Sequence, residues 1–148
     1  MKKPEGMTKM RKHSELTAFI PILKRDTFGE WIVDKENDGS PEHPFHMPFV
    51  HYTEAVDRFI ETLYSFCEAH PEYEHTRYGE TLDQYRSESG VKDLTEADVS
   101  HAEAKLVIAL LIGAVRADRF CEGALLDLCK NGSIVRWLER LEAIDKEQ

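Results

Sequence analysis

The chain has 148 residues, of which 41% are hydrophobic and 32% are charged, a balance typical of one soluble globular domain. Its formal net charge is −9. This charge argues against nucleic acid as a partner, because nonspecific binding to nucleic acid needs a cationic surface. The longest apolar run covers residues 106–115, about half the length that spans a bilayer, so no membrane segment is predicted.

Cysteine usage and the N-terminal residues indicate the cellular compartment. The cysteines form no Cys-x-x-Cys pair, which favours the reducing cytoplasm over a disulfide framework. Each is expected on an apolar helix face, namely Cys67, Cys121 and Cys129. Residues 1–13 are basic and polar without an apolar core, so they do not read as a signal peptide. We expect a cytoplasmic protein with a flexible N-terminal arm over residues 1–13 and a single helical domain over 14–148.

All six prolines lie at or before Pro71, and the N-terminal half of the chain is predicted to be irregular. Ser14 is the predicted N-cap of a first helix that Pro21 keeps short or kinked. Residues 28–34 and 45–52 are expected to be extended, on either side of a polar loop rich in glycine and proline. They predict a small hairpin that lies on the helices, because an isolated hairpin is only marginally stable. The inward face of the first helix is predicted to be Leu16, Phe19, Ile20 and Leu23.

Two further helices follow the hairpin. Thr53 is the predicted N-cap of a helix that ends near His70, since Pro71 disfavours helical geometry in the residue before it. Its buried stripe has helical spacing: Val56, Phe59, Ile60, Leu63, Phe66 and Cys67. A shorter helix, ending around Gly90, is predicted from the spacing of Tyr78, Leu82 and Tyr85.

Residues 100–144 are the most strongly patterned part of the chain. Ser100 and Glu103 form the pattern of a capping box, which opens a predicted helix over 101–117. Its apolar residues surround the whole helix, so this helix is predicted to be the central one. Gly113 is expected to allow close approach of a neighbouring helix.

A short helix then runs to Lys130. Asn131-Gly132 ends it, and Ser133 is the predicted N-cap of an amphipathic final helix. The buried face of that helix is Ile134, Trp137, Leu138, Leu141 and Ile144.

These elements predict a mainly α fold: a single helical-bundle-like domain of about six helices with a small hairpin in the N-terminal half. Their order, and the residues of segments 47–52, 114–123 and 131–134, resemble a small bacterial family known only as a domain of unknown function (the DUF 6508 type). The resemblance covers roughly residues 16–141. It implies a bacterial origin and supports the domain bounds and the helical fold. It implies no activity, cofactor or catalytic residue.

The densest charged cluster lies beside the central helix, at residues 116–122. Arg119 and Glu122 have the i, i+3 spacing of a helical ion pair. One interpretation is that these charges hold a kink between two helices. The other is an arginine-lined pocket that binds a carboxylate or a phosphate. The candidate ligand-binding residues are Arg116, Arg119, Glu122, Tyr52 and Tyr78.

Histidines and cysteines form a weaker pattern beside this cluster. His43, His46 and His51, with Cys67 and His70, contain ligand types for zinc, but their spacing matches no zinc module. We therefore predict surface or capping histidines, with no metal and no cofactor.

A second pattern suggests helix-turn-helix geometry over residues 122–140, which places Arg136 and Arg140 on an exposed face. Glu139 and Glu142 share that face. The sequence therefore favours a helical corner over a DNA-binding element.

Aromatic residues in and after the irregular half are expected to form a lid over the helical core; the alternative is a groove for a peptide or ligand. They are Trp31, Phe45, Phe49, Tyr52, Tyr78 and Tyr85.

The sequence leads to three functional hypotheses. The first is a non-enzymatic interaction module for an unidentified protein partner, or for a second copy in a homodimer. The second is a small-molecule- or metal-dependent enzyme, with its site between residues 43–52 and the cluster at 116–122. The third is a DNA-binding regulator.

Overall fold

A computed structural model describes residues 11–147 of the chain. The predicted fold class is confirmed, since the structure is 61% helical and contains one two-stranded sheet among the described residues. The elements, in chain order, are α1 (Ser14–Thr17), α2 (Phe19–Lys24), β1 (Gly29–Ile32), β2 (Phe49–Tyr52), α3 (Glu54–Ala69), α4 (Tyr78–Ser89), α5 (Ala104–Ala117), α6 (Ala124–Lys130) and α7 (Ser133–Glu147). Short 3-10 turns lie at Pro71–Tyr73, His75–Arg77 and Leu94–Glu96.

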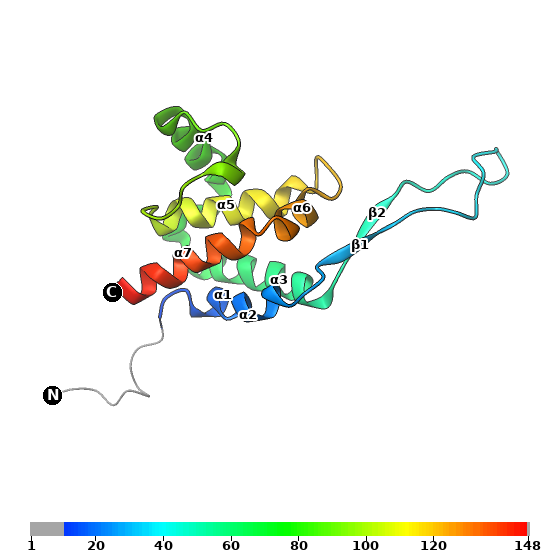
Figure 1. The fold of residues 1–148 in the computed structure, drawn as a ribbon. Coiled ribbons are helices and arrows are strands. Elements are labelled where there is room, and N and C mark those ends of the chain that lie inside the picture. The colour runs from blue at the N-terminus through cyan, green and yellow to red at the C-terminus, as the bar shows by residue number, and fades with distance from the viewer. Residues whose placement is uncertain (1–10, 148) are drawn as a thin grey trace.

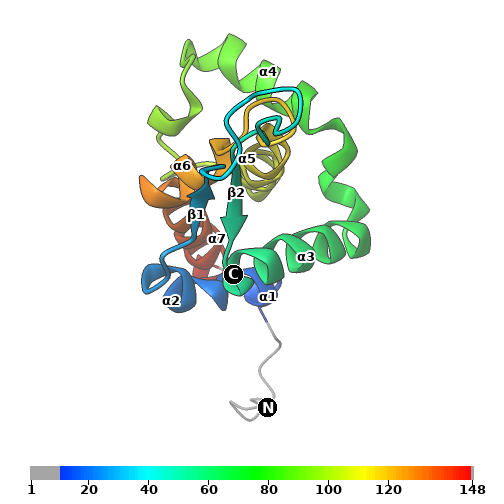
Figure 2. The ribbon, with the colours of Figure 1, turned by 90° about the vertical axis from the view of Figure 1, so that its right-hand side faces the viewer.

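Helix α5 lies at the centre, between α4, α6 and α7 (Figures 1 and 2). Its central position is confirmed by its buried residues: Val107, Ile108, Ala109, Leu110, Leu111, Ile112 and Ala114. The predicted start at residue 101 and the capping box are wrong. The Ser100 N–H donates to the Asp98 carboxylate at 3.0 Å, so it does not pair with Glu103. The helix begins at Ala104 without a side-chain cap.

At Gly113 helix α4 approaches α5 closely, as predicted. A Cβ atom at this position would lie 3.1 Å from Leu82 Cδ1, tighter than an ordinary van der Waals contact. The missing side chain therefore sets the spacing between the two helices.

The first predicted helix is split at Ala18 into α1 and α2, which lie against α3 and α7. The break agrees with the predicted effect of Pro21, which has no N–H to donate to the Thr17 carbonyl and whose ring would clash with that carbonyl in a continuous helix. The second helix begins at Phe19, which places Pro21 in its first turn, where backbone N–H groups have no helical acceptor. Ser14 is the first residue of α1 and not its cap.

Two other helix starts can be compared with their predicted caps. The predicted cap of α3 is confirmed, because Thr53 accepts a hydrogen bond from the Val56 N–H. Ser133, by contrast, is the first residue of α7. Its N–H donates to the Asn131 side chain at 2.9 Å, so Asn131 serves the role predicted for Ser133. Gly132, with φ of 87°, makes the left-handed turn before α7.

The predicted hairpin is confirmed. Its base lies on the helices, as predicted, through bonds from Val50 and Tyr52, but the rest of it does not. Strands β1 and β2 pair antiparallel, with Gly29 opposite Tyr52 and Ile32 opposite Phe49. Together with the loop between them they form a finger (residues 29–52) that projects from the helical body (Figure 1). The aromatic lid is therefore wrong for Phe45 and Phe49, which are exposed. Trp31 is also exposed in part, but its ring contacts Gly123. Only the tyrosines of the predicted lid pack against the core, namely Tyr52, Tyr78 and Tyr85.

Candidate functional site

The base of the finger is built into the junction between α5 and α6. Val50 is buried, and its N–H donates to Glu122 Oε2 at 2.8 Å. The Tyr52 hydroxyl donates to Asp118 Oδ2 at 2.6 Å and accepts from the Leu126 N–H at 3.0 Å. These bonds tie β2 to the start of α6 across more than 60 residues of sequence, so the finger leaves the body in a defined direction.

The Tyr52 hydroxyl remains a hydrogen-bond donor at the base of the finger. Burial, followed by the hydrogen bond to Asp118, raises the pKa of Tyr52 far above its ordinary value. The phenol therefore stays protonated, which suits a structural bond and not proton transfer.

Trp31 packs over Gly123, which has φ of 89°. A Cβ atom at Gly123 would collide with the Trp31 ring. Only glycine satisfies both the backbone conformation and this contact. Gly123 therefore lets β1 rest on the start of α6.

The finger exposes apolar side chains, most of them beyond its base. Eight large apolar side chains are exposed among residues 11–147, and six of them lie on the finger. Met47 is 82% exposed. Surface hydrophobic residues are ordinary when scattered, whereas a cluster marks a contact surface. The six are Trp31, Ile32, Val33, Phe45, Met47 and Phe49.

The loop of the finger has an ordered backbone. The Asp34 carboxylate accepts hydrogen bonds from the N–H groups of Glu36, Asn37 and His46 at 3.0, 3.1 and 2.8 Å. The bond from His46, followed by those from Asn37, lowers the pKa of Asp34 well below its ordinary value. Asp34 is therefore ionised at any physiological pH and keeps the two sides of the loop together.

The finger is also acidic. Between residues 28 and 49 one lysine, Lys35, is set against five carboxylates, giving a net charge of −4: Glu30, Asp34, Glu36, Asp38 and Glu42. These exposed apolar side chains thus lie in a negative field.

The ligand-binding residues predicted from the sequence do not come together in one site. The Arg116 guanidinium lies 5.7 Å from the Tyr78 ring centre, and both line a hollow of about 170 Å³ beside α4. Arg119 is exposed. The predicted ion pair between Arg119 and Glu122 is wrong, because Glu122 bonds to Val50 and no ion pair with Arg119 forms within residues 11–147.

The arginine side chains of α7 bond to other parts of the protein and are not available to bind DNA. Arg136 Nη2 donates to the Thr95 carbonyl at 2.7 Å, and Arg140 Nε donates to the Ala102 carbonyl at 2.9 Å. Both side chains therefore fasten the segment before α5 to α7. Their predicted exposure on a DNA-facing surface is wrong.

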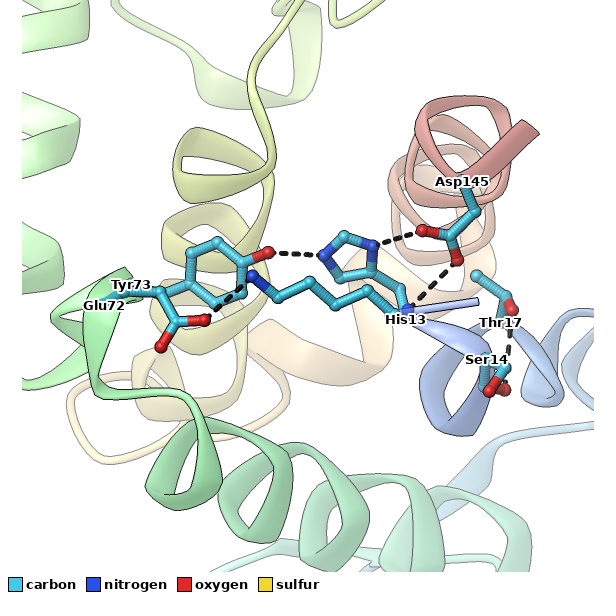
Figure 3. Close-up of polar contacts among 7 residues, drawn as sticks. His13, Ser14, Thr17, Glu72, Tyr73 and Asp145 are labelled. Carbon is cyan, nitrogen blue, oxygen red and sulfur yellow. Dashed lines mark hydrogen bonds and ion pairs between the residues drawn. The ribbon is translucent and has the colours of Figure 1, made fainter. Parts of the chain in front are cut away.

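Sequence reasoning missed a buried polar network around His13 (Figure 3). His13 is 2% exposed and Asp145 is 4% exposed. His13 Nδ1 lies 2.8 Å from Asp145 Oδ1, and Nε2 lies 2.7 Å from the Tyr73 hydroxyl. A carboxylate only accepts hydrogen bonds, so Nδ1 carries the proton and Tyr73 donates to Nε2. No local pattern signals this contact, because His13 and Asp145 are 132 residues apart.

His13 also corrects the predicted N-terminal arm. The arm was expected over residues 1–13, and its first ten residues lie outside the described part of the chain. His13, its last residue, is part of the core. Burial lowers the pKa of His13, while Asp145 opposes this effect, and the neutral ring satisfies all its partners.

The other histidines and the cysteines show no converging site. His70 Nδ1 bonds to the Phe66 carbonyl at 2.9 Å. Within the described residues, no three His, Cys, Asp or Glu side chains are grouped closely enough to hold a metal ion. Burial raises the pKa of Cys67 to about 11 and that of Cys129 to about 12, so both thiols stay protonated. Cys121 is exposed, which corrects its predicted place on an apolar helix face.

Comparison with known proteins places the chain in a family but gives no activity. Residues 8–147 match the family described as "Family of unknown function (DUF6508)". No curated protein and no solved structure matches the chain. Across residues 11–147 none of the helices combines the length and the apolar character needed to cross a membrane.

Proposed function

This chain belongs to the family of unknown function DUF6508, and we propose that it is a non-enzymatic, cytoplasmic protein-interaction module whose finger binds a partner protein. One observation carries the proposal: six of the eight large apolar side chains exposed on residues 11–147 lie on the finger. The bonds from Asp34 support it further, because an ordered loop loses less conformational entropy when it binds.

The charge of the finger indicates the kind of partner. A net charge of −4 between residues 28 and 49 favours a surface with an apolar centre and a basic rim. The apolar contact supplies affinity, while the charges steer the encounter and reject acidic surfaces. A second copy is a poor fit, since the whole chain carries −9 and two acidic fingers would repel each other.

The proposal is tested by capture from native extract with full-length protein. The finger variant Phe45→Ser/Met47→Ser removes two exposed apolar side chains. The matched control, Ile22→Ser, removes an exposed apolar side chain from the helical body. We expect a basic protein that wild type and Ile22→Ser retain at equal levels and the finger variant loses. Its retention should fall as salt rises, because screening weakens the attraction between the charges.

Two results would contradict the proposal. If every captured protein binds wild type and the finger variant equally, the finger is not the contact surface. If light scattering shows a dimer that the finger substitutions dissociate, the partner is a second copy and not a basic protein.

A further inference from the structure

The hollow of about 170 Å³ that contains Arg116 is lined by α3, α5 and residues 75–78, and no residue of the finger contributes to it. Its volume is below the range of about 300–1,000 Å³ found for sites that enclose a drug-sized ligand. The hollow therefore has room for a small group and not for a large organic molecule. The side chains that line it are Tyr64, His75, Thr76, Tyr78, Ile112 and Arg116.

The lining of this hollow carries hydrogen-bond donors and, among the described residues, no carboxylate. Five of its six side chains can donate: the guanidinium, the imidazole and three hydroxyls. The two carboxylates that flank residues 75–78 in the sequence do not line the hollow and are paired elsewhere. Glu74 pairs with Lys105 at 2.7 Å, and Glu80 pairs with Arg77 at 2.9 Å. An anion in the hollow would therefore meet a positive charge and no acidic side chain in the lining.

The charge of Arg116 is not neutralised within the described part of the chain. Arg116 is partly buried and forms no ion pair within residues 11–147. Its guanidinium lies 5.7 Å from the Tyr78 ring centre, and contact with Tyr78, followed by Tyr64, raises the pKa of Arg116. Its Nε is buried without a hydrogen-bond partner among these residues, which leaves the terminal Nη groups for a ligand. Two neutral tyrosines thus lie beside a cation that has no counter-ion.

We propose that this hollow binds a phosphate group, either as free phosphate or as the terminal group of a phosphorylated molecule. The Nη groups of Arg116 donate to the phosphate, and the hydroxyls of Tyr64 and Tyr78 donate to its other oxygens. Thr76 is exposed, so the hollow opens to solvent at this residue.

The lining also distinguishes phosphate from carboxylate, the two anions that an arginine fork binds in bidentate geometry. A carboxylate has two oxygens in one plane, whereas a phosphate group directs its oxygens to the corners of a tetrahedron. Donors that come from α3, α5 and residues 75–78 can surround the tetrahedral group. Ile112 is the apolar member of the lining, which offers little contact for the organic part of a carboxylic acid.

NMR titration of full-length ¹⁵N-labelled protein tests the proposal. Inorganic phosphate is added at constant pH and ionic strength, with chloride as the balancing anion. The Arg116 Nε–H signal and the amide signals of residues 75–78 and 112–116 should shift until the site is saturated. Acetate should bind at least about tenfold more weakly, because it leaves donors of the lining without acceptors.

Phenyl phosphate distinguishes the two sources of the phosphate group. Binding at least as tight as that of inorganic phosphate supports a phosphorylated molecule as the ligand. Weaker binding than that of inorganic phosphate supports free phosphate.

Two pairs of variants locate the binding site. Arg116→Gln should weaken phosphate binding at least about tenfold, because charge-assisted bonds are lost. Its matched control, Arg119→Gln, removes the same charge from an exposed arginine outside the hollow and should bind like wild type. Tyr64→Phe should weaken binding about fivefold through the loss of one neutral hydrogen bond. Tyr85→Phe, outside the hollow, should not.

The proposal is overturned if inorganic phosphate produces no saturable shift, or if acetate binds as tightly as phosphate. It is also overturned if Arg116→Gln binds phosphate as tightly as Arg119→Gln does. If Arg116→Gln fails to fold, equal binding by Tyr64→Phe and Tyr85→Phe overturns it instead. None of the substituted side chains lies on the finger, so these results do not depend on the proposed interaction function.

Discussion

The helical body and the finger use apolar residues in opposite ways. In the body, α5 places seven residues in the core and its neighbours cover them. In the finger, only Val50 of the two strands is buried, and the large apolar side chains lie outside. Burial stabilises the fold, whereas exposed apolar surface contributes nothing until something covers it. The difference separates the part of the chain that maintains the fold from the part available for binding.

The largest difference in stability is expected between a core side chain and a finger side chain that are each replaced by alanine. Leu111 is fully buried on α5, so Leu111→Ala should lower the free energy of unfolding by about 3–5 kcal/mol through a cavity. Phe45→Ala on the finger should change it by less than about 0.5 kcal/mol. Urea unfolding followed by circular dichroism measures both. Similar losses for the two variants would mean that the finger loop belongs to the cooperative core.

The next largest effect is expected at His13, inside the body. His13→Ala leaves the buried Asp145 carboxylate and the Tyr73 hydroxyl without their ring partner. We expect a loss of about 3 kcal/mol, since unsatisfied buried groups are costly.

This loss should depend on pH. The folded pKa of His13 lies below its ordinary 6.5, so its neutral form stabilises the fold above pH 6.5, and this contribution falls as the pH drops below that value. The gap in melting temperature between wild type and His13→Ala should therefore be larger at pH 8 than at pH 5. A gap that grows on acidification would mean that the folded protein holds His13 as a cation.

A smaller loss of stability than at His13 is expected where the two regions join. Tyr52→Phe removes the donor to Asp118 and the acceptor for Leu126. It should lower stability by about 1–2 kcal/mol and speed amide exchange in β1 and β2, while α5 keeps its protection. Tyr85→Phe is the matched control, since its hydroxyl has no hydrogen bond within residues 11–147. Equal exchange in both variants would show that Tyr52 does not hold the finger.

The helices were predictable because their pattern is local. The apolar stripe of α3 and the face of α7 repeat at 3.6-residue spacing, and that spacing alone defines a buried side. The strands were also predictable as extended segments. The projection of the strands away from the helices was not predictable. Alternation along a strand defines two faces, but it does not identify the residues that either face contacts.

The candidate site was predicted poorly from the sequence. Chemistry-bearing residues such as Arg116, Arg119 and Glu122 are close in sequence, but the turn after α5 points them to different neighbours. The contact of His13 with Asp145 depends on the complete fold and leaves no trace in local spacing. Competition between nearby groups also misled the prediction, as where Asp98 took the Ser100 N–H in place of Glu103.

The His13–Asp145 contact also has a mechanical consequence. It joins α1 to the last turn of α7, so a pulling force applied between residues 11 and 147 would load this hydrogen-bonded pair and the packing of α1 on α7 before it reached α5. The finger lies outside that line of tension. A force applied to the finger would instead act on the contacts that Tyr52, Val50 and Trp31 make with the helical body. The body would therefore resist the two forces through different sets of contacts.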